Sequence, residues 1–226
     1  MTRSRNLPGD ANDTKPLPVR LHGPTKKPAP PLLRPLAIAA LLAVFGAAPA
    51  HAHTGTGLAG GFVAGLLHPL SGMDHLLAMV SVGLWGAVLG RPLLVALPVI
   101  FPAMMAGGAM LGMFAVPVPP VEFGIALSVL MLGTAIATGL RPPVWLACAM
   151  VGLFALFHGY AHGRELPSAA DPIGYSAGFV LSTGLLHVVG IAIGALYETG
   201  RGRLLIKGLG AAIGAAGLYF LTSAVL

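Results

Sequence analysis

Six long apolar segments, separated by short polar breaks, follow one another from about residue 58 onward. A transmembrane helix needs roughly 20 mostly apolar residues, and the segments are long enough. The first one exceeds a straight span, and Pro69, Ser71 and Gly72 interrupt it, so we expect a half-helix, a break and a second helix that together cross once. The pattern predicts an all-α membrane protein, a compact bundle of about six transmembrane helices, the first one broken at the HPLSG segment. The segments lie at about 58–89, 92–116, 121–140, 143–161, 173–196 and 204–226.

The composition supports a membrane protein and excludes a soluble one. Only 9% of the 226 residues are charged, and the mean hydropathy is +0.85. A soluble domain carries about 25% charged residues, so this chain cannot cover a water-facing surface. The single cysteine, Cys148, lies in an apolar stretch. It is expected to be a small buried hydrophobe, and one cysteine allows neither an internal disulfide nor a cysteine-based metal site.

Most of the net charge of +6 belongs to the first 35 residues, where seven of the 13 lysines and arginines lie. An apolar run from Leu36 to Ala48 follows, and then two sites of the A-x-A type at 48–50 and 50–52. This order is typical of a secretory signal peptide. We expect residues 1–52 to be a cleaved signal peptide with a long basic n-region, and residues 53–226 to be the transmembrane domain. Because the charge lies in the leader, it does not indicate nucleic-acid binding.

Three questions about the leader stay open. The apolar run is shorter than a span, yet an uncleaved first helix is the other interpretation. Cleavage falls before His51 or before His53, and the second site would make His53 the mature N-terminus. The long n-region is either a real extension or the result of a start codon assigned too early.

The positive-inside rule gives an orientation to the six crossings. With the mature N-terminus outside, the cytoplasmic loops hold five basic residues and the outer loops hold one, together with three acids. This bias agrees with the signal peptide. The inner group is Arg91, Arg141, Arg201, Arg203 and Lys207, and the outer group is Arg164, Glu122, Glu165 and Asp171.

Glycine is unusually frequent, at 32 residues, and often recurs at a spacing of four, as in Gly61 and Gly65 or Gly190 and Gly194. Small residues at this spacing let helix backbones approach closely in lipid. The pattern indicates a compact bundle, and it leaves open whether the chain forms a homo-oligomer.

A first group of polar residues lies at the predicted break, in HPLSGMDH, where we find His68, Asp74 and His75. An ionisable group in hydrocarbon costs about 2.5–3.5 kcal/mol on insertion scales. Seven residues separate the two histidines, so on a continuous helix both would lie on one face. Broken helices at membrane depth commonly line an ion site. Imidazole nitrogen with carboxylate oxygen suits Ni, Co, Zn or Cu(II) better than Mg or Ca.

A second group lies in FHGYAHGRELP, at the outer end of the fourth span. His158 and His162 are four residues apart and share a helix face, and Glu165 follows three residues later. Glu122 opens the third span, also on the outer side, and is either a metal ligand or a solvated end residue. His187 lies inside the fifth span, where a helix-to-helix hydrogen bond is the alternative role. Acids outside and histidines deeper suggest a graded path for a cation.

These blocks resemble the HupE/UreJ family of nickel and cobalt permeases. The resemblance covers residues 53–226 and rests on GLLHPLSGMDHLLAMVSVGLW, FPAMMAGG and FHGYAHGRELP. The His-x5-Asp-His spacing favours this family over the larger NiCoT permeases, which have a related His-x4-Asp-His element. The resemblance implies uptake of Ni²⁺, with Co²⁺ as the alternative, to supply hydrogenase or urease maturation. Together with the signal peptide and the charge bias, it leads us to expect a bacterial inner-membrane protein whose mature N-terminus is periplasmic. The resemblance implies metal ligands at His68, Asp74 and His75, with further positions on which the family relies at Phe101, Glu122, His162 and Glu165. His158, a further candidate metal ligand, lies in the same matching block as His162.

The resulting hypothesis is a secondary transporter that is not an enzyme and holds no permanent cofactor. Its partners are a divalent metal ion and the lipid bilayer, and no nucleic acid. The sequence has no GxxxxGK[ST] motif for ATP, so the metal gradient and the membrane potential, about 2.3 kcal/mol per charge per 100 mV, would drive uptake. Ligands must be deprotonated, so uptake should fall as the external pH drops through the range where histidine gains a proton. The expected path runs from an outer capture group (His53, Glu122, Glu165, His162) to His68, Asp74 and His75, with Phe101 as a hydrophobic gate and His187 further along.

Other classes remain open. Paired intramembrane histidines are also typical of membrane haem proteins. An intramembrane protease is a weaker alternative, since neither a GxSG nor an HExxH motif is present. A metal sensor or chaperone is another, although six spans without a soluble domain favour conduction. The sequence does not separate nickel from cobalt, or passive from proton-coupled transport.

Overall fold

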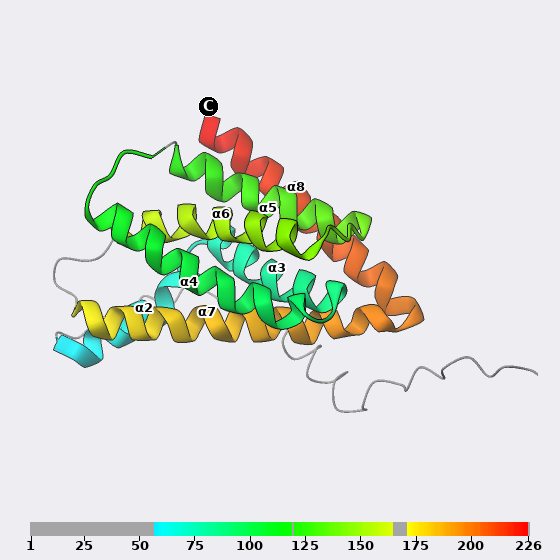
Figure 1. The fold of residues 1–226 in the computed structure, drawn as a ribbon, viewed down its shortest axis with the longest axis horizontal. Coiled ribbons are helices and arrows are strands. Elements are labelled where there is room, and N and C mark those ends of the chain that lie inside the picture. Colours follow the sequence, from blue (N-terminus) through cyan, green and yellow to red (C-terminus); the bar gives the residue numbers. More distant parts are fainter. Residues whose placement is uncertain (1–56, 119, 165–170, 226) are drawn as a thin grey trace, which may run out of the picture.

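The computed structural model describes residues 57–118, 120–164 and 171–225, and every regular element in these ranges is a helix. Five of them are long and apolar enough to cross a membrane, and a bent pair at the start makes up to six spans. The expected all-α bundle is therefore confirmed (Figure 1). The leader, His53 and Glu165 lie outside the described residues. The elements are α2 (Gly57–Ser71), α3 (Met73–Leu89), α4 (Leu93–Met113), α5 (Val121–Thr138), α6 (Val144–Arg164), α7 (Pro172–Gly194), the 3₁₀ helix η1 (Ala195–Glu198) and α8 (Gly200–Val225).

The expected break in the first segment falls at Gly72, between α2 and α3. The two helices meet there at an angle of 85°, while Pro69 lies inside the last turn of α2. The expectation that His68 and His75 share one face of a helix is therefore wrong. The bend places the two histidines on different helices, and helical periodicity does not continue across it.

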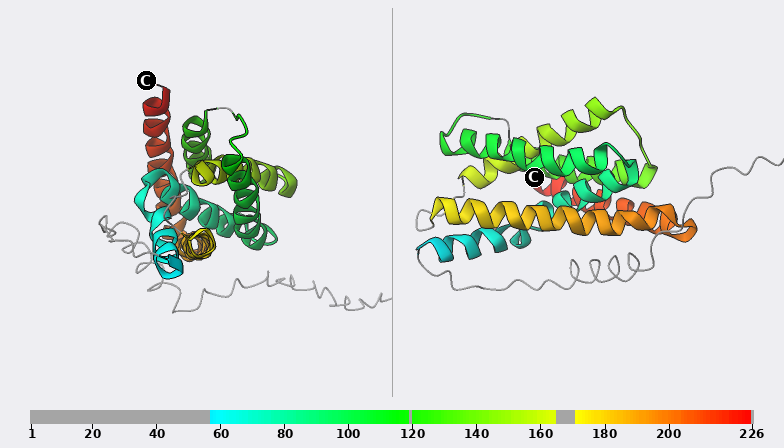
Figure 2. Two further views of the ribbon diagram at one scale, coloured as in Figure 1. Left: turned by 90° about the vertical axis from the view of Figure 1, so that its left-hand side faces the viewer. Right: turned by 60° about the horizontal axis from the view of Figure 1, so that its bottom comes forward.

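The bent pair crosses the bundle once, because α2 and α3 follow α7 in the same direction. Gly61 near the start of α2 packs against Asp171 at the start of α7. Gly83 in α3 packs against the backbone of His187, much further along α7. A re-entrant pair would turn back along α7 instead. Figure 2 shows α2 beside the first part of α7 from two further sides. Counting the bent pair as one span gives six candidate crossings among the described residues.

Glycines bring the helices into close pairs. A Cβ on Gly159 of α6 would overlap the carbonyl oxygen of Met105 in α4, and a Cβ on Gly133 of α5 would overlap the backbone of Gly214 in α8. The bundle thus consists of three close pairings, α2 and α3 with α7, α4 with α6, and α5 with α8. This agrees with small residues as the means of helix contact in lipid.

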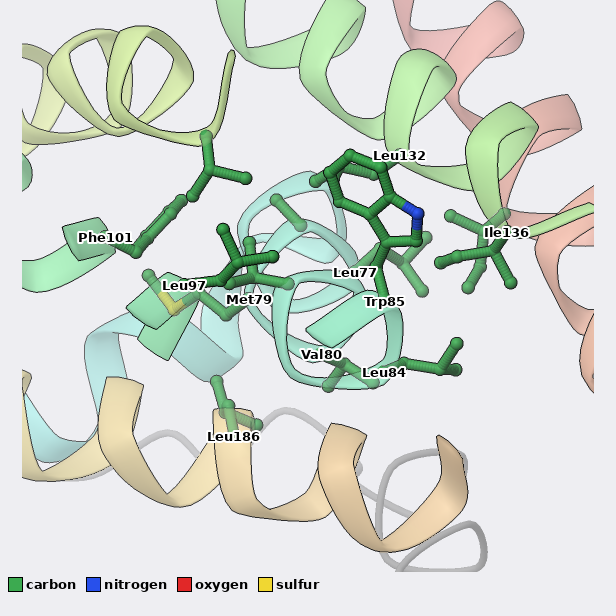
Figure 3. Packing of buried hydrophobic residues seen from close by; sticks show 14 of the residues in the cluster. Leu77, Met79, Val80, Leu84, Trp85, Leu97, Phe101, Leu132, Ile136 and Leu186 are labelled. Atoms are coloured by element: carbon green, nitrogen blue, oxygen red, sulfur yellow. The ribbon is translucent and has the colours of Figure 1, made fainter. Parts of the chain in front are cut away.

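Helix α3 forms the centre of the bundle. Almost every side chain from Leu76 to Val88 is buried, and a helix that is apolar on all sides belongs inside. Figure 3 shows Trp85 and Met79 of α3 surrounded by residues of α4, α5 and α7. The outer helices expose large apolar side chains instead, such as Ile173 and Leu204 at 78% and 77%, as expected of surfaces that face lipid.

Basic residues of the α5–α6 loop and of the start of α8 gather at one end of the bundle. Arg141 donates a hydrogen bond from its Nη2 to the carbonyl oxygen of Val88 at 3.1 Å, which joins the α5–α6 loop to the end of α3. Tyr197 lies beside Gly139 of the same loop, and the guanidinium of Arg203 sits 5.4 Å from the centre of its ring. The loops that the charge pattern assigned to one side of the membrane are therefore neighbours in space.

Candidate metal site

Three histidines from three helices meet where α2 bends into α3. The ring centre of His162, near the end of α6, lies 4.9 Å from that of His68 and 4.6 Å from that of His75. The bend at Gly72 makes this possible, because it turns both ends of the broken helix toward α6. The two motifs of the sequence therefore form one cluster.

Asp74 orients the ring of His75. The backbone N–H of His75 and its ring Nδ1 both donate to Oδ1 of Asp74, at 2.8 and 2.9 Å. With the proton assigned to Nδ1 by this contact, Nε2 carries the lone pair. A Cβ on Gly72 would lie 2.9 Å from the same carboxylate oxygen, so the glycine at the break leaves room for the pair.

A hydrogen bond also fixes the orientation of the His158 ring. This residue is fully buried, and its Nδ1 donates to the carbonyl oxygen of Phe154 at 2.9 Å, so its Nε2 also carries a lone pair. Its ring centre lies 5.1 Å from that of His75. A histidine that binds metal commonly donates its other N–H to a carboxylate or a backbone carbonyl, and both histidines do so.

A pocket of about 450 Å³ leads to this cluster between α4, the end of α6 and the start of α7. His162 lines it, together with apolar residues such as Met105 and Phe179. Met113 and Ile173 also line it and belong to the end of the bundle opposite the α5–α6 loop. The cluster can thus be approached from that end.

Phe101 separates the cluster from His187. Its ring centre lies 5.5 Å from that of His158 and 5.4 Å from that of His187, and its side chain is completely buried. Figure 3 shows Phe101 on α4, with Leu97 and Met79 nearby. His187 is itself 1% exposed. The result is a continuous file of rings in the order His68, His162, His75, His158, Phe101 and His187.

The acids of the expected capture group are not part of this file. Glu122 is exposed in the first turn of α5, and within the described ranges no contact joins it to the histidines. His53 and Glu165 fall outside those ranges. Their role in capture stays a prediction.

Comparison with known proteins decides the family. Residues 39–220 match the model of the family described as HupE / UreJ protein. The chain belongs to the HupE/UreJ family. It is 44% identical over 172 residues to Protein HupE of Rhizobium leguminosarum bv. viciae, an alignment that covers 76% of this chain and 90% of that protein. No solved structure matches significantly. HupE/UreJ proteins are accessory to hydrogenases and ureases and are generally nickel or cobalt transporters rather than enzymes, which favours transport over the haem and protease alternatives.

In this HupE/UreJ protein the histidines gather without forming a finished coordination sphere. Within the described parts of the chain, no three His, Cys, Asp or Glu side chains surround one point as metal ligands do. The rings contact each other mainly edge to face. The side chains would have to rotate to direct the lone pairs of His75 and His158 at a shared ion.

The sequence reasoning missed the contribution of α7. Tyr175 and Phe179 place their rings 5.7 and 6.2 Å from His68, and Phe179 lies 4.4 Å from His162. Together with Thr183 and His187 they recur every four residues, which puts them on one face of a helix. That spacing was a signal in the sequence, but uncharged side chains in an apolar segment do not stand out.

Proposed function

We propose that this HupE/UreJ protein is a secondary transporter that carries Ni²⁺, with Co²⁺ as the alternative, inward across a bacterial inner membrane to supply hydrogenase or urease maturation. The observation that carries the proposal is the file of rings from His68 to His187, in which neighbouring ring centres lie 4.6 to 5.5 Å apart. An ion can pass along such a file by exchanging one ligand at a time.

Entry occurs at the end that carries Asp171 and Glu122. The pocket that reaches His162 opens there, and negative groups raise the local concentration of a cation. Glu122, Glu165 and His53 are the proposed capture residues. The apolar lining of the pocket removes water as the ion approaches the histidines.

The main binding site combines His75 and His158, each with Nε2 available, with His68, His162 and the carboxylate of Asp74. Imidazole nitrogen suits late first-row divalent metals, and one carboxylate offsets part of the ion's charge in a medium where an isolated charge is costly. Because Oδ1 already accepts from His75, Asp74 acts both by orienting that ring and by its charge.

Phe101 closes the path below this site. Its ring is fully buried between His158 and His187, and a hydrophobic constriction blocks an ion by keeping water out. The ion advances when the ring turns aside. With the basic end of the bundle in the cytoplasm, the membrane potential favours inward movement by about 2.3 kcal/mol per charge per 100 mV, and twice that for a divalent ion.

Uptake of radioactive nickel by cells that express the protein tests this function. Cells with the wild-type chain should accumulate nickel above cells without it, and His75→Ala or Asp74→Ala at equal protein level should remove the difference. An excess of Co²⁺ that competes would place cobalt among the substrates. Wild-type cells that accumulate no more nickel than empty cells would rule the function out.

A further inference from the structure

Thr183 is a buried polar residue in α7 that no motif includes. Its side chain is completely buried, and within the described residues its Oγ1 has no hydrogen-bond partner. A threonine inside a helix usually donates to a carbonyl three or four residues earlier, as Thr138 does to Thr134 in α5. A buried hydroxyl without a partner costs free energy, so its position needs a cause.

Thr183 lies on the same face of α7 as the ring file. Phe179, one turn earlier, contacts His162, and His187, one turn later, contacts Phe101. This face packs against α3, since Gly190 on it lies against Val80 and Leu186 points from α7 toward α3 (Figure 3). The hydroxyl is therefore placed between the outer cluster and His187.

His187 has the same unusual environment. Both of its ring nitrogens are buried without a well-formed hydrogen bond in the described structure, although the backbone carbonyl of Pro98 in α4 lies close enough to interact with one of them. The spacing of four residues places its imidazole and the hydroxyl of Thr183 next to each other along the helix. Pro98 engages at most one nitrogen of the ring, so the hydroxyl of Thr183 and the other nitrogen of His187 are neighbouring buried groups that an entering ligand would satisfy.

We propose that Thr183 and His187 form a second, inner metal-binding site that receives the ion once it has passed Phe101. The proposal rests on the proposed transport function. The inner site offers one neutral nitrogen and one neutral oxygen, whereas the outer cluster has several imidazoles and a carboxylate. Transport requires a site that binds well enough to accept an ion and weakly enough to release it. The inner site thus suits release toward the basic end of the bundle.

Two variants separate the hydroxyl from the shape of the side chain. Thr183→Val keeps the branched side chain and removes the hydroxyl, whereas Thr183→Ser keeps the hydroxyl. In nickel-uptake assays at matched protein level, Thr183→Val should lower the maximal rate about ten-fold, the effect of losing one polar ligand. Its half-saturating nickel concentration and its equilibrium nickel binding in detergent should stay at wild-type values, and Thr183→Ser should transport normally.

A double variant tests whether the two residues act at one site. Thr183→Val should add little to the loss caused by His187→Ala, because residues that share an ion give non-additive effects. Normal transport by Thr183→Val, or equal loss in Thr183→Ser and Thr183→Val, would overturn the inner site while leaving the transport function in place. Absence of nickel uptake by the wild type would overturn both.

Discussion

His75 and Asp74 form a pair in which one carboxylate oxygen accepts from both the backbone N–H and the ring Nδ1 of the histidine. The arrangement fixes the ring with Nε2 available, directly after the bend between α2 and α3. Because the two residues are adjacent in the sequence, the short motif itself fixes the orientation of the His75 ring without a distant partner.

Removal of the Asp74 carboxylate should therefore weaken nickel binding through His75 as well as through the lost charge. We expect Asp74→Ala to raise the nickel dissociation constant about 10–100-fold, the effect seen when a partner of a metal-binding histidine is removed. Asp74→Asn, whose amide oxygen can still accept from Nδ1, should fall between Asp74→Ala and the wild type. Titration of purified protein with nickel measures this, and equal affinities for the two variants would show that orientation plays no part.

A methyl group on Gly159 should disturb the site by separating α4 from α6. Its Cβ would overlap the carbonyl oxygen of Met105, and His158 and His162 flank it in the sequence. We expect Gly159→Ala to lower stability by about 1–3 kcal/mol, a typical cost of overpacking, and to reduce uptake. Gly107→Ala is the matched control, because its Cβ would meet only a side-chain carbon of Leu156 at 3.9 Å. Thermal unfolding in detergent should separate the two variants; similar melting temperatures would argue against this contact.

The role of Phe101 as a gate can be tested by the accessibility of introduced cysteines to a thiol reagent. In a Cys148→Ser background, which removes the one cysteine of the sequence, the variant His187→Cys should not react with a membrane-impermeant thiol reagent added from outside, since Phe101 covers position 187. A cysteine at position 162 should react, because His162 lines the pocket. Phe101→Ala should open position 187 to the reagent. Labelling at 187 with Phe101 intact would mean that the ring does not close the path.

Glu122 should influence capture rather than binding in the cluster. Its carboxylate is exposed and separate from the histidines, so we expect Glu122→Gln to raise the half-saturating nickel concentration a few-fold while leaving the maximal rate unchanged. Interactions between exposed charges are screened by salt, and the difference from the wild type should shrink as ionic strength rises. A loss of maximal rate instead would indicate direct contact with the ion.

The spans, their order and the cluster residues followed from the sequence, because length and hydropathy determine crossings and ionisable residues stand out in an apolar chain. The shared helix face of His68 and His75 did not hold, since periodicity cannot report an 85° bend at Gly72. The glycine pattern predicted close contacts but not the partners, because glycines recur in every span. Thr183 escaped notice because nothing in its local sequence distinguishes it.

Transport by the purified protein tests the account most directly. Protein in liposomes that contain a nickel-sensitive fluorescent chelator should admit Ni²⁺, faster when the interior is made negative, because the ion carries its charge across the membrane. Liposomes with the double variant His75→Ala/His158→Ala should admit nickel no faster than protein-free liposomes. The control variant Met73→Ala, at an exposed residue close to His75 in the sequence, should behave like the wild type. Nickel entry through the double variant at the wild-type rate would contradict the assignment of the histidine file as the path.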